Sequence, residues 1–141
     1  MKRMFVSSAI LVVGVVSVAW SQATAPAPVT QPDPANFTGK VVGHPTTDIR
    51  MNRYSFEPGG RTNWHSHEAG QSVFIEKGRA RVQERGGPMR ELGPRTAFTA
   101  EPGVVHWHGA MPGEPLTQVS LSFGTTTWMD KVTDDQYAGR R

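Results

Sequence analysis

Apolar positions along the chain come in short patches, and turns rich in Gly and Pro separate them. The patches accommodate strands but leave no room for a helix of three turns. The best strand candidates are residues 73–75, 80–83, 104–108 and 116–123. The last of these alternates strictly, with an apolar row running from Thr117 to Phe123 and a mainly polar row formed by Leu116, Gln118, Ser120 and Ser122.

This alternation is typical of a barrel wall that has a packed layer on one side and a wet cavity on the other. Only residues 126–137 have a pattern compatible with a short helix. The pattern therefore predicts an all-β fold, either a sandwich or a small barrel.

The first residues have a different character. Lys2 and Arg3 precede an uncharged, largely apolar run over residues 4–19. Ser21 and Ala23 then provide the small residues of a signal-peptidase site, as in a secretory signal peptide. We expect residues 1–23 to be a signal peptide, 24–36 a Pro-rich tether and 37–138 the folded domain, in a periplasmic or secreted protein that is free of the membrane after cleavage. A retained membrane anchor is the alternative, although the run is short for a spanning helix.

Charge and composition narrow the function classes. The chain has 15 Lys and Arg against 12 Asp and Glu, and loss of the signal lowers the net charge from +3 to +1. Basic and acidic side chains alternate over residues 76–91, which argues against nucleic acid as a partner. The absence of cysteine excludes disulfides, thiolate metal sites and cysteine nucleophiles.

Four of the five histidines form two His-x-His pairs, His65 with His67 and His106 with His108. Residues two apart on a strand point to the same face, so each pair can present two imidazoles to one cavity. Without thiolates, such a site suits a divalent ion that accepts nitrogen and oxygen donors. Gln71 lies close enough in sequence to add an amide oxygen, although taken alone it also fits a surface amide.

Two stretches resemble the conserved motifs of the cupin superfamily. The first runs over residues 60–71 and ends at Gly78, and the second covers residues 102–106. Further matches over residues 37–39, 56–59, 106–110 and 128–137 resemble the bacterial cupin-type hydroxynitrile lyases, which depend on manganese. The resemblance implies a small double-stranded β-helix (jelly-roll) barrel.

The same resemblance implies the site. Its metal ligands would be His65, His67, Gln71 and His106, and the cavity would be lined by Thr62, His108, Asn52, Tyr54, Gln118 and Ser122. Mn²⁺ is the expected ion, with Fe²⁺ or Zn²⁺ as alternatives. A small-molecule substrate and a homodimer or homotetramer are also expected from this resemblance.

Two residues depart from common cupin patterns. Gln71 stands where most metal cupins have Glu, so the ligand set is neutral, which favours Lewis-acid chemistry over redox chemistry. Gln118 stands where the lyase-type cupins have a further histidine, and an amide cannot act as a general base. His108 can take that role, or it can be a rim residue that hydrogen-bonds a ligand.

These observations predict a redox-neutral lyase, similar to a hydroxynitrile lyase, that acts on a small carbonyl-derived substrate. His108 would relay the proton, and Thr62 and Gln118 would orient the substrate. A metal-dependent dioxygenase of the quercetinase type and a non-catalytic small-molecule-binding cupin are the alternatives.

Overall fold

A computed structural model describes residues 33–43 and 48–140. The expected signal peptide, most of the expected tether and His44 lie outside these ranges. Residues 33–43 and residues 48–140 belong to separate units, and the first contains a short 3-10 helix, Pro34–Asn36. Within the described ranges, no helix has the length and apolar character needed to cross a membrane.

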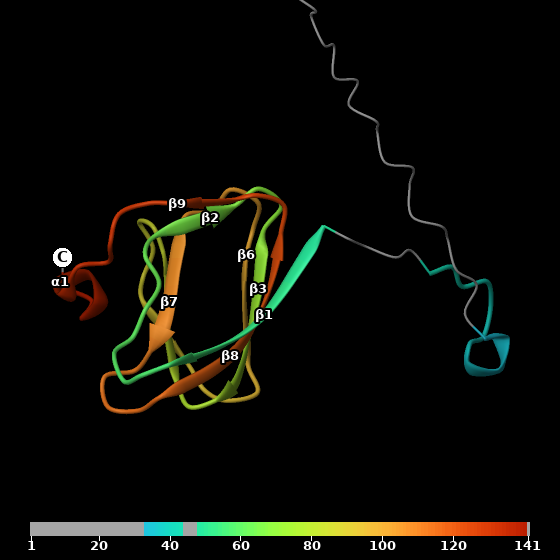
Figure 1. Ribbon diagram of the computed structural model, residues 1–141, viewed down its shortest axis with the longest axis horizontal. Helices are drawn as coiled ribbons and strands as arrows, with labels where there is room; N and C mark the ends of the chain where they lie inside the picture. The colour runs from blue at the N-terminus through green and yellow to red at the C-terminus, as the bar shows by residue number, and fades with distance from the viewer. Residues whose placement is uncertain (1–32, 44–47, 141) are drawn as a thin grey trace, which may run out of the picture. The chain divides into compact units, whose positions relative to one another are not determined.

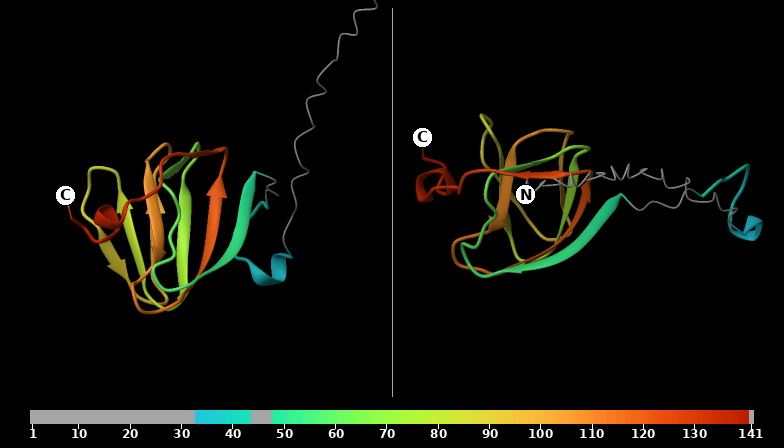
Figure 2. Two further views of the ribbon diagram at one scale, coloured as in Figure 1. Left: turned by 60° about the vertical axis from the view of Figure 1, so that its left-hand side comes forward. Right: turned by 45° about the horizontal axis from the view of Figure 1, so that its top comes forward.

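The second unit consists almost entirely of β-structure. In chain order its elements are β1 (Ile49–Phe56), β2 (His65–His67), β3 (Gln71–Lys77), β4 (Ala80–Glu84), β5 (Arg90–Leu92), β6 (Ala97–Ala100), β7 (His106–Ala110), β8 (Leu116–Phe123), β9 (Thr126–Trp128) and α1 (Asp134–Tyr137). One antiparallel sheet has the order β1-β8-β3-β6, and the other has the order β5-β4-β7-β2-β9. Figures 1 and 2 show the two sheets facing each other across the interior. The predicted all-β barrel is confirmed.

Strand β8 shows how the sequence builds this wall. Its polar row, which begins at Leu116 and includes Gln118, is buried and faces the interior, whereas its apolar row faces outward and is half-buried. The registers with β1 and β3 extend these rows across the sheet, because Ser122 lies opposite both Arg50 and Gln71. The polar row faces inward as expected, but of its members Ser122 lines a cavity, whereas Leu116, Gln118 and Ser120 are buried away from it. The apolar row lies on the outer face and is half-buried, and no packed layer formed by the described residues covers it.

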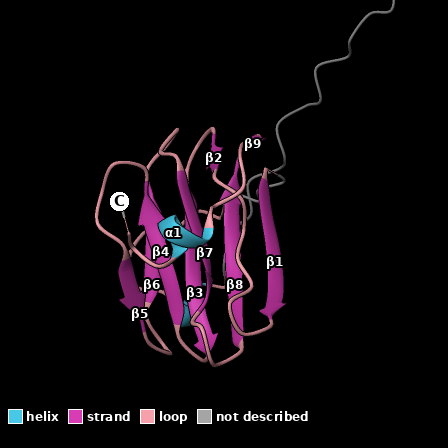
Figure 3. Ribbon diagram, turned by 90° about the vertical axis from the view of Figure 1, so that its left-hand side faces the viewer, coloured by secondary structure: helices cyan, strands magenta, loops and turns pink. Residues whose placement is uncertain are grey.

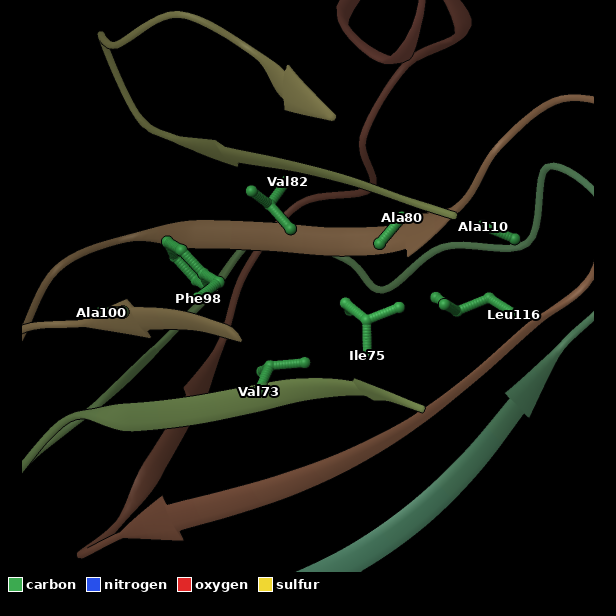
Figure 4. Close-up of a cluster of buried hydrophobic side chains, with 8 residues drawn as sticks. All are labelled: Val73, Ile75, Ala80, Val82, Phe98, Ala100, Ala110 and Leu116. Atoms are coloured by element: carbon green, nitrogen blue, oxygen red, sulfur yellow. The ribbon is translucent and has the colours of Figure 1, made fainter. Parts of the chain in front are cut away.

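Apolar side chains fill one part of the barrel interior. A buried cluster draws on both sheets and comprises Val73, Ile75, Ala80, Val82, Phe98, Ala100, Ala110 and Leu116. Figure 4 shows these side chains meeting between the strands. This core fixes the strands, and both histidine pairs belong to those strands or to β2, which pairs with β7.

A second cluster lies on the reverse side of the histidine strands. It contains Trp64, Trp107, Val132 and Tyr137. Helix α1 lies over the outer face of β4 and β7 (Figure 3), and the Tyr137 hydroxyl donates a 2.6 Å hydrogen bond to the Ala110 carbonyl. The two tryptophans alternate with histidines in sequence, and they point away from the histidine side as the pattern predicts.

The loop before β2 crosses β7 at very close range. A Cβ added to Gly109 would stand 2.6 Å from the Cα of Arg61, which is closer than real Cβ contacts come. Only glycine permits this approach, and the approach lets the Thr62 amide donate to the His108 carbonyl at 2.9 Å. The loop therefore positions Thr62 beside His108.

The sequence located some elements better than others. The predicted strand at 116–123 coincides with β8, and those at 73–75 and 80–83 lie within β3 and β4. The strand predicted at 104–108 begins only at His106. The helix proposed for 126–137 is limited to Asp134–Tyr137, because residues 126–128 pair with β2 as strand β9.

Candidate metal centre

The two histidine pairs meet inside the barrel. Strands β2 and β7 pair with His65 directly opposite His106, and the centroids of these two rings are 4.3 Å apart. His67 and His108 lie on the same inner faces of their strands. All four imidazoles are almost fully buried, with exposed fractions of 3% or less. The predicted convergence of both pairs on one place is therefore present.

Gln71 joins the histidines from the opposite sheet, at the start of β3. Its Oε1 lies 2.9 Å from His106 Nε2, and its Nε2 donates to Ser122 Oγ at 2.9 Å. The side chain is 4% exposed, so it is not a surface amide. Ser122 holds the amide so that its oxygen faces the imidazoles.

Hydrogen bonds indicate which nitrogen carries the proton in two of the rings. His65 Nδ1 lies 3.0 Å from the Asn63 carbonyl, and His106 Nδ1 lies 3.0 Å from the Val104 carbonyl. A carbonyl oxygen can only accept, so Nδ1 of neutral His65 carries the proton and its Nε2 presents a lone pair. His106 has an accepting oxygen at each ring nitrogen, since Gln71 Oε1 lies at its Nε2, and we assign its proton to Nδ1 by analogy with His65. The His106 lone pair then faces the Gln71 oxygen, an arrangement of two acceptors that a cation between them would stabilise.

His67 has a different partner. Its Nδ1 lies 3.0 Å from the hydroxyl oxygen of Thr126 on β9, which can either donate or accept. Its Nε2 is buried and has no hydrogen-bond partner among the described residues. A buried ring nitrogen without a partner is costly, and coordination to a metal would satisfy it.

Hydrogen bonding places the proton of His108 on the other ring nitrogen, Nε2. The Gln118 amide nitrogen lies 3.0 Å from His108 Nδ1 and 3.1 Å from Ser120 Oγ, while Gln118 Oε1 is buried without a partner. The reverse amide orientation would leave two N–H groups unmet in place of one oxygen, so the nitrogen is the group that faces His108. His108 Nδ1 therefore accepts, and in the neutral ring Nε2 carries the proton. That N–H has no described partner.

Burial keeps all four rings neutral. Loss of hydration, together with the neighbouring His65, lowers the pKa of His67 and of His106 to about 4 in the metal-free protein. Burial also lowers the pKa of His65, and it holds the pKa of His108 well below its ordinary value. Neutral imidazole is the form that binds metal ions, so the electrostatics of the cluster fit that use.

The donor set fits a divalent metal. Ligand atoms of His65, His106 and His108 all lie within 4.8 Å of one another. The ring centroid of His67 lies 5.2 Å from that of His65 and 5.8 Å from that of His106. Nitrogen donors with an amide oxygen and no thiolate suit ions such as Mn²⁺, Fe²⁺ or Zn²⁺.

The histidines open onto a cavity of about 670 Å³. Five of the side chains expected to line it do so, namely Asn52, Tyr54, Thr62, His108 and Ser122. Gln118 does not belong to this lining, because it is fully buried behind His108. Its contact with the cavity is therefore indirect, through the ring that it orients.

Sequence reasoning missed several lining residues, including Arg50, Phe56, Thr126 and Trp128. The ring centroid of Trp128 lies 4.7 Å from that of His65, although the Trp128 side chain is 61% exposed. The sequence of β1 carries no regular alternation that could have drawn attention to Arg50 and Phe56. Its apolar residues change rows, because Ile49 and Met51 belong to one row and Tyr54 and Phe56 to the other. Which row of β1 faces inward depends on its pairing with β8.

Comparison with known proteins agrees with this geometry. Residues 52–121 match the cupin domain family. The (R)-mandelonitrile lyase of Granulicella tundricola is 36% identical over 110 residues, covering 75% of each chain. A cupin-like protein from Thermotoga maritima has a TM-score of 0.63 at 37% identity, covering 67% of this chain and 74% of that one.

A more distant likeness shows the fold alone. The DMSP lyase DddQ from Ruegeria pomeroyi has a TM-score of 0.53 at 22% identity, covering 60% of this chain and 44% of that one. Together, the paired motifs, the two-sheet barrel, the buried histidine cluster and the identity to the mandelonitrile lyase show that the chain belongs to the cupin family.

Proposed function

We propose that this protein is a metal-dependent lyase that makes or cleaves cyanohydrins or closely related carbonyl-derived compounds. One structural observation carries the proposal, namely that imidazole nitrogens and an amide oxygen converge in a buried pocket with no carboxylate among them. The 36% identity to an (R)-mandelonitrile lyase supports this reaction class over the other cupin chemistries.

Hydrogen bonding supports a specific ligand set within the cluster. His65 and His106 present lone pairs from Nε2, and His67 has an unpartnered Nε2. We therefore assign these three rings and Gln71 Oε1 as the ligands, with Mn²⁺ as the proposed ion. His108 is excluded from the set despite its proximity, because the bond from Gln118 leaves a proton on its Nε2.

A bound divalent ion would supply Lewis-acid polarisation of a substrate oxygen. The chain itself supplies the hydrogen-bond donor, since His108 Nε2–H faces the cavity without a described partner and can donate to that oxygen. Gln118 keeps this proton on Nε2, and Thr62 Oγ1 accepts from the His108 amide at 3.2 Å and holds its strand position. A fixed donor aimed at developing negative charge is an effective form of catalysis.

The test combines metal content with turnover. The purified full-length protein, loaded with Mn²⁺, should release benzaldehyde from mandelonitrile without oxygen, and a chelator should abolish the activity. His106→Ala should lose both stoichiometric metal and turnover, because it removes a ligand. Stoichiometric metal without turnover of mandelonitrile or other cyanohydrins would remove the lyase proposal. Full turnover in the His106→Ala variant would remove the ligand assignment.

We also propose that the protein is exported after signal cleavage and forms a homodimer or homotetramer. The half-buried outer row of β8, flanked by exposed Met51 and Phe74, supports pairing of two copies through this apolar sheet face. Light scattering of the mature protein should give twice or four times the monomer mass. A monomer at micromolar concentration would contradict this expectation.

A further inference from the structure

Arg50 has an unusual position for a charged side chain. It belongs to the row of β1 that faces the barrel interior, opposite Ser122, which in turn lies opposite Gln71. It is the only charged side chain among the described residues that line the histidine cavity. Neighbouring strands are roughly 4.8 Å apart, so the Cα atoms of Arg50 and Gln71 are separated by roughly 10 Å.

The Arg50 guanidinium is anchored but not neutralised. Its Nη2 donates to the Gly124 carbonyl at 3.1 Å and to Thr126 Oγ1 at 2.6 Å, and that hydroxyl also contacts His67 Nδ1. These bonds fix the group beside the cavity and use one of its three nitrogens. The other two nitrogens have no described protein partner.

Most other arginines of the described chain behave differently, although Arg85 and Arg95 also form no ion pair there. Six arginines form ion pairs with carboxylates, and these are Arg53, Arg61, Arg79, Arg81, Arg90 and Arg140. Arg53 is the most informative comparison, because it lies three positions after Arg50 on the same strand, faces outward and pairs with Glu76. Arg50 forms no ion pair among residues 33–43 and 48–140.

A cavity that contains this cation and binds a divalent ion carries several positive charges and no carboxylate of its own. Like charges repel each other, and an anion placed between them relieves the repulsion. A guanidinium matches a carboxylate in shape and can bind it through two parallel hydrogen bonds. The negative charge that would balance these cations is therefore best supplied by the carboxylate of a ligand.

We propose that Arg50 binds the carboxylate of a small oxo acid or hydroxy acid, and that the cavity takes such acids in preference to neutral carbonyl compounds of the same size. The carbonyl or hydroxyl oxygen of the acid would lie toward the histidines, which rests on the proposed function. The partly exposed aromatic rings of Tyr54 and Trp128, which line the same cavity, would cover an apolar substituent. Arg50 thus determines which carbonyl compounds the site accepts.

The experiment measures binding by calorimetry and does not depend on turnover. Phenylglyoxylate is compared with phenylglyoxylamide, a neutral ligand of nearly equal size, on the Mn²⁺-loaded and the metal-free full-length protein. Wild type should bind the acid at least about tenfold more tightly than the amide in both forms. Arg50→Gln should abolish this preference by weakening binding of the acid at least about tenfold more than binding of the amide, and Arg53→Gln should retain the preference.

Three results would overturn the proposal: equal affinity of wild type for acid and amide, a preference that persists in Arg50→Gln, or a preference that vanishes when only the metal is removed. A parallel loss of acid and amide binding in Arg50→Gln would also overturn it, because Arg50 would then serve only to hold the loop around Thr126. Failure of mandelonitrile cleavage would remove the lyase proposal and leave this binding result intact.

Discussion

The opposite protonation of His106 and His108 leads to a decisive prediction. Both imidazoles lie on the inner face of β7, two positions apart, and both are within reach of one metal ion. If hydrogen bonding sets their roles, His108→Leu should keep stoichiometric Mn²⁺, whereas His106→Ala should lose it. Elemental analysis after dialysis against Mn²⁺-containing buffer measures the difference directly.

The His108→Leu substitution should also change turnover and stability by amounts that follow from the lost hydrogen bonds. Loss of a preorganised donor to developing negative charge costs on the order of 10²- to 10³-fold in kcat, so His108→Leu should slow mandelonitrile cleavage by that factor. The variant also leaves a Gln118 N–H buried without an acceptor, which should cost about 1–3 kcal/mol of unfolding free energy. Adding Gln118→Leu removes the unmet group and should recover most of that stability, but not the activity.

A specific result would refute this reasoning. If His108→Leu lost Mn²⁺ as completely as His106→Ala while remaining folded by circular dichroism, His108 would be a ligand and its Nε2 would not carry a proton. Nitrogen-15 chemical shifts of the metal-free protein provide an independent check, since they distinguish protonated from bare ring nitrogens. A bare His108 Nε2 in that spectrum would contradict the assignment in the same way.

Three further predictions concern stability. His67 and His106 have a pKa of about 4 in the folded, metal-free protein, and unfolding returns both rings to their ordinary pKa. As the pH falls from 6.5 to about 4, the free energy of unfolding should therefore decrease by about 1.4 kcal/mol per pH unit for each ring. Urea titrations that show constant stability over this range would contradict the prediction. Gly109→Ala should prevent folding or lower stability by several kcal/mol, whereas Gly93→Ala, where a Cβ meets open space, should be nearly neutral in the same thermal melts. Tyr137→Phe removes a buried hydrogen bond to a β7 carbonyl and should cost about 1–3 kcal/mol, with an unchanged melting temperature as the opposing result.

The sequence was most informative where one short stretch carries the whole signal. The spacing of each His-x-His pair predicts the relative position of its two rings, because alternation on a strand places both rings on one face. The strict alternation of residues 116–123 likewise predicted which row of β8 faces inward, and the structure confirms it. These local patterns were enough for the fold class and for the convergence of the histidines.

Other features depend on pairs that are distant in sequence. The inward direction of Arg50 follows from the register of β1 with β8, which no local pattern of β1 specifies. The proton position on His108 follows from Gln118, whose amide reaches the ring from the facing sheet. Residues 126–128 form a strand and not a helix because β2 offers them an open edge. In each case tertiary contacts determine the result, because the local sequence has only a weak structural preference.

Strand β2 has only three residues, and its neighbours β7 and β9 come later in the chain, with Trp128 directly opposite His65. A nascent polypeptide that has emerged from the ribosome only as far as β2 therefore holds two unsupported imidazoles. The remaining donors and the second edge of β2 arrive near the end of synthesis. Any ion that this cluster binds therefore meets its full set of donors only after the barrel has closed.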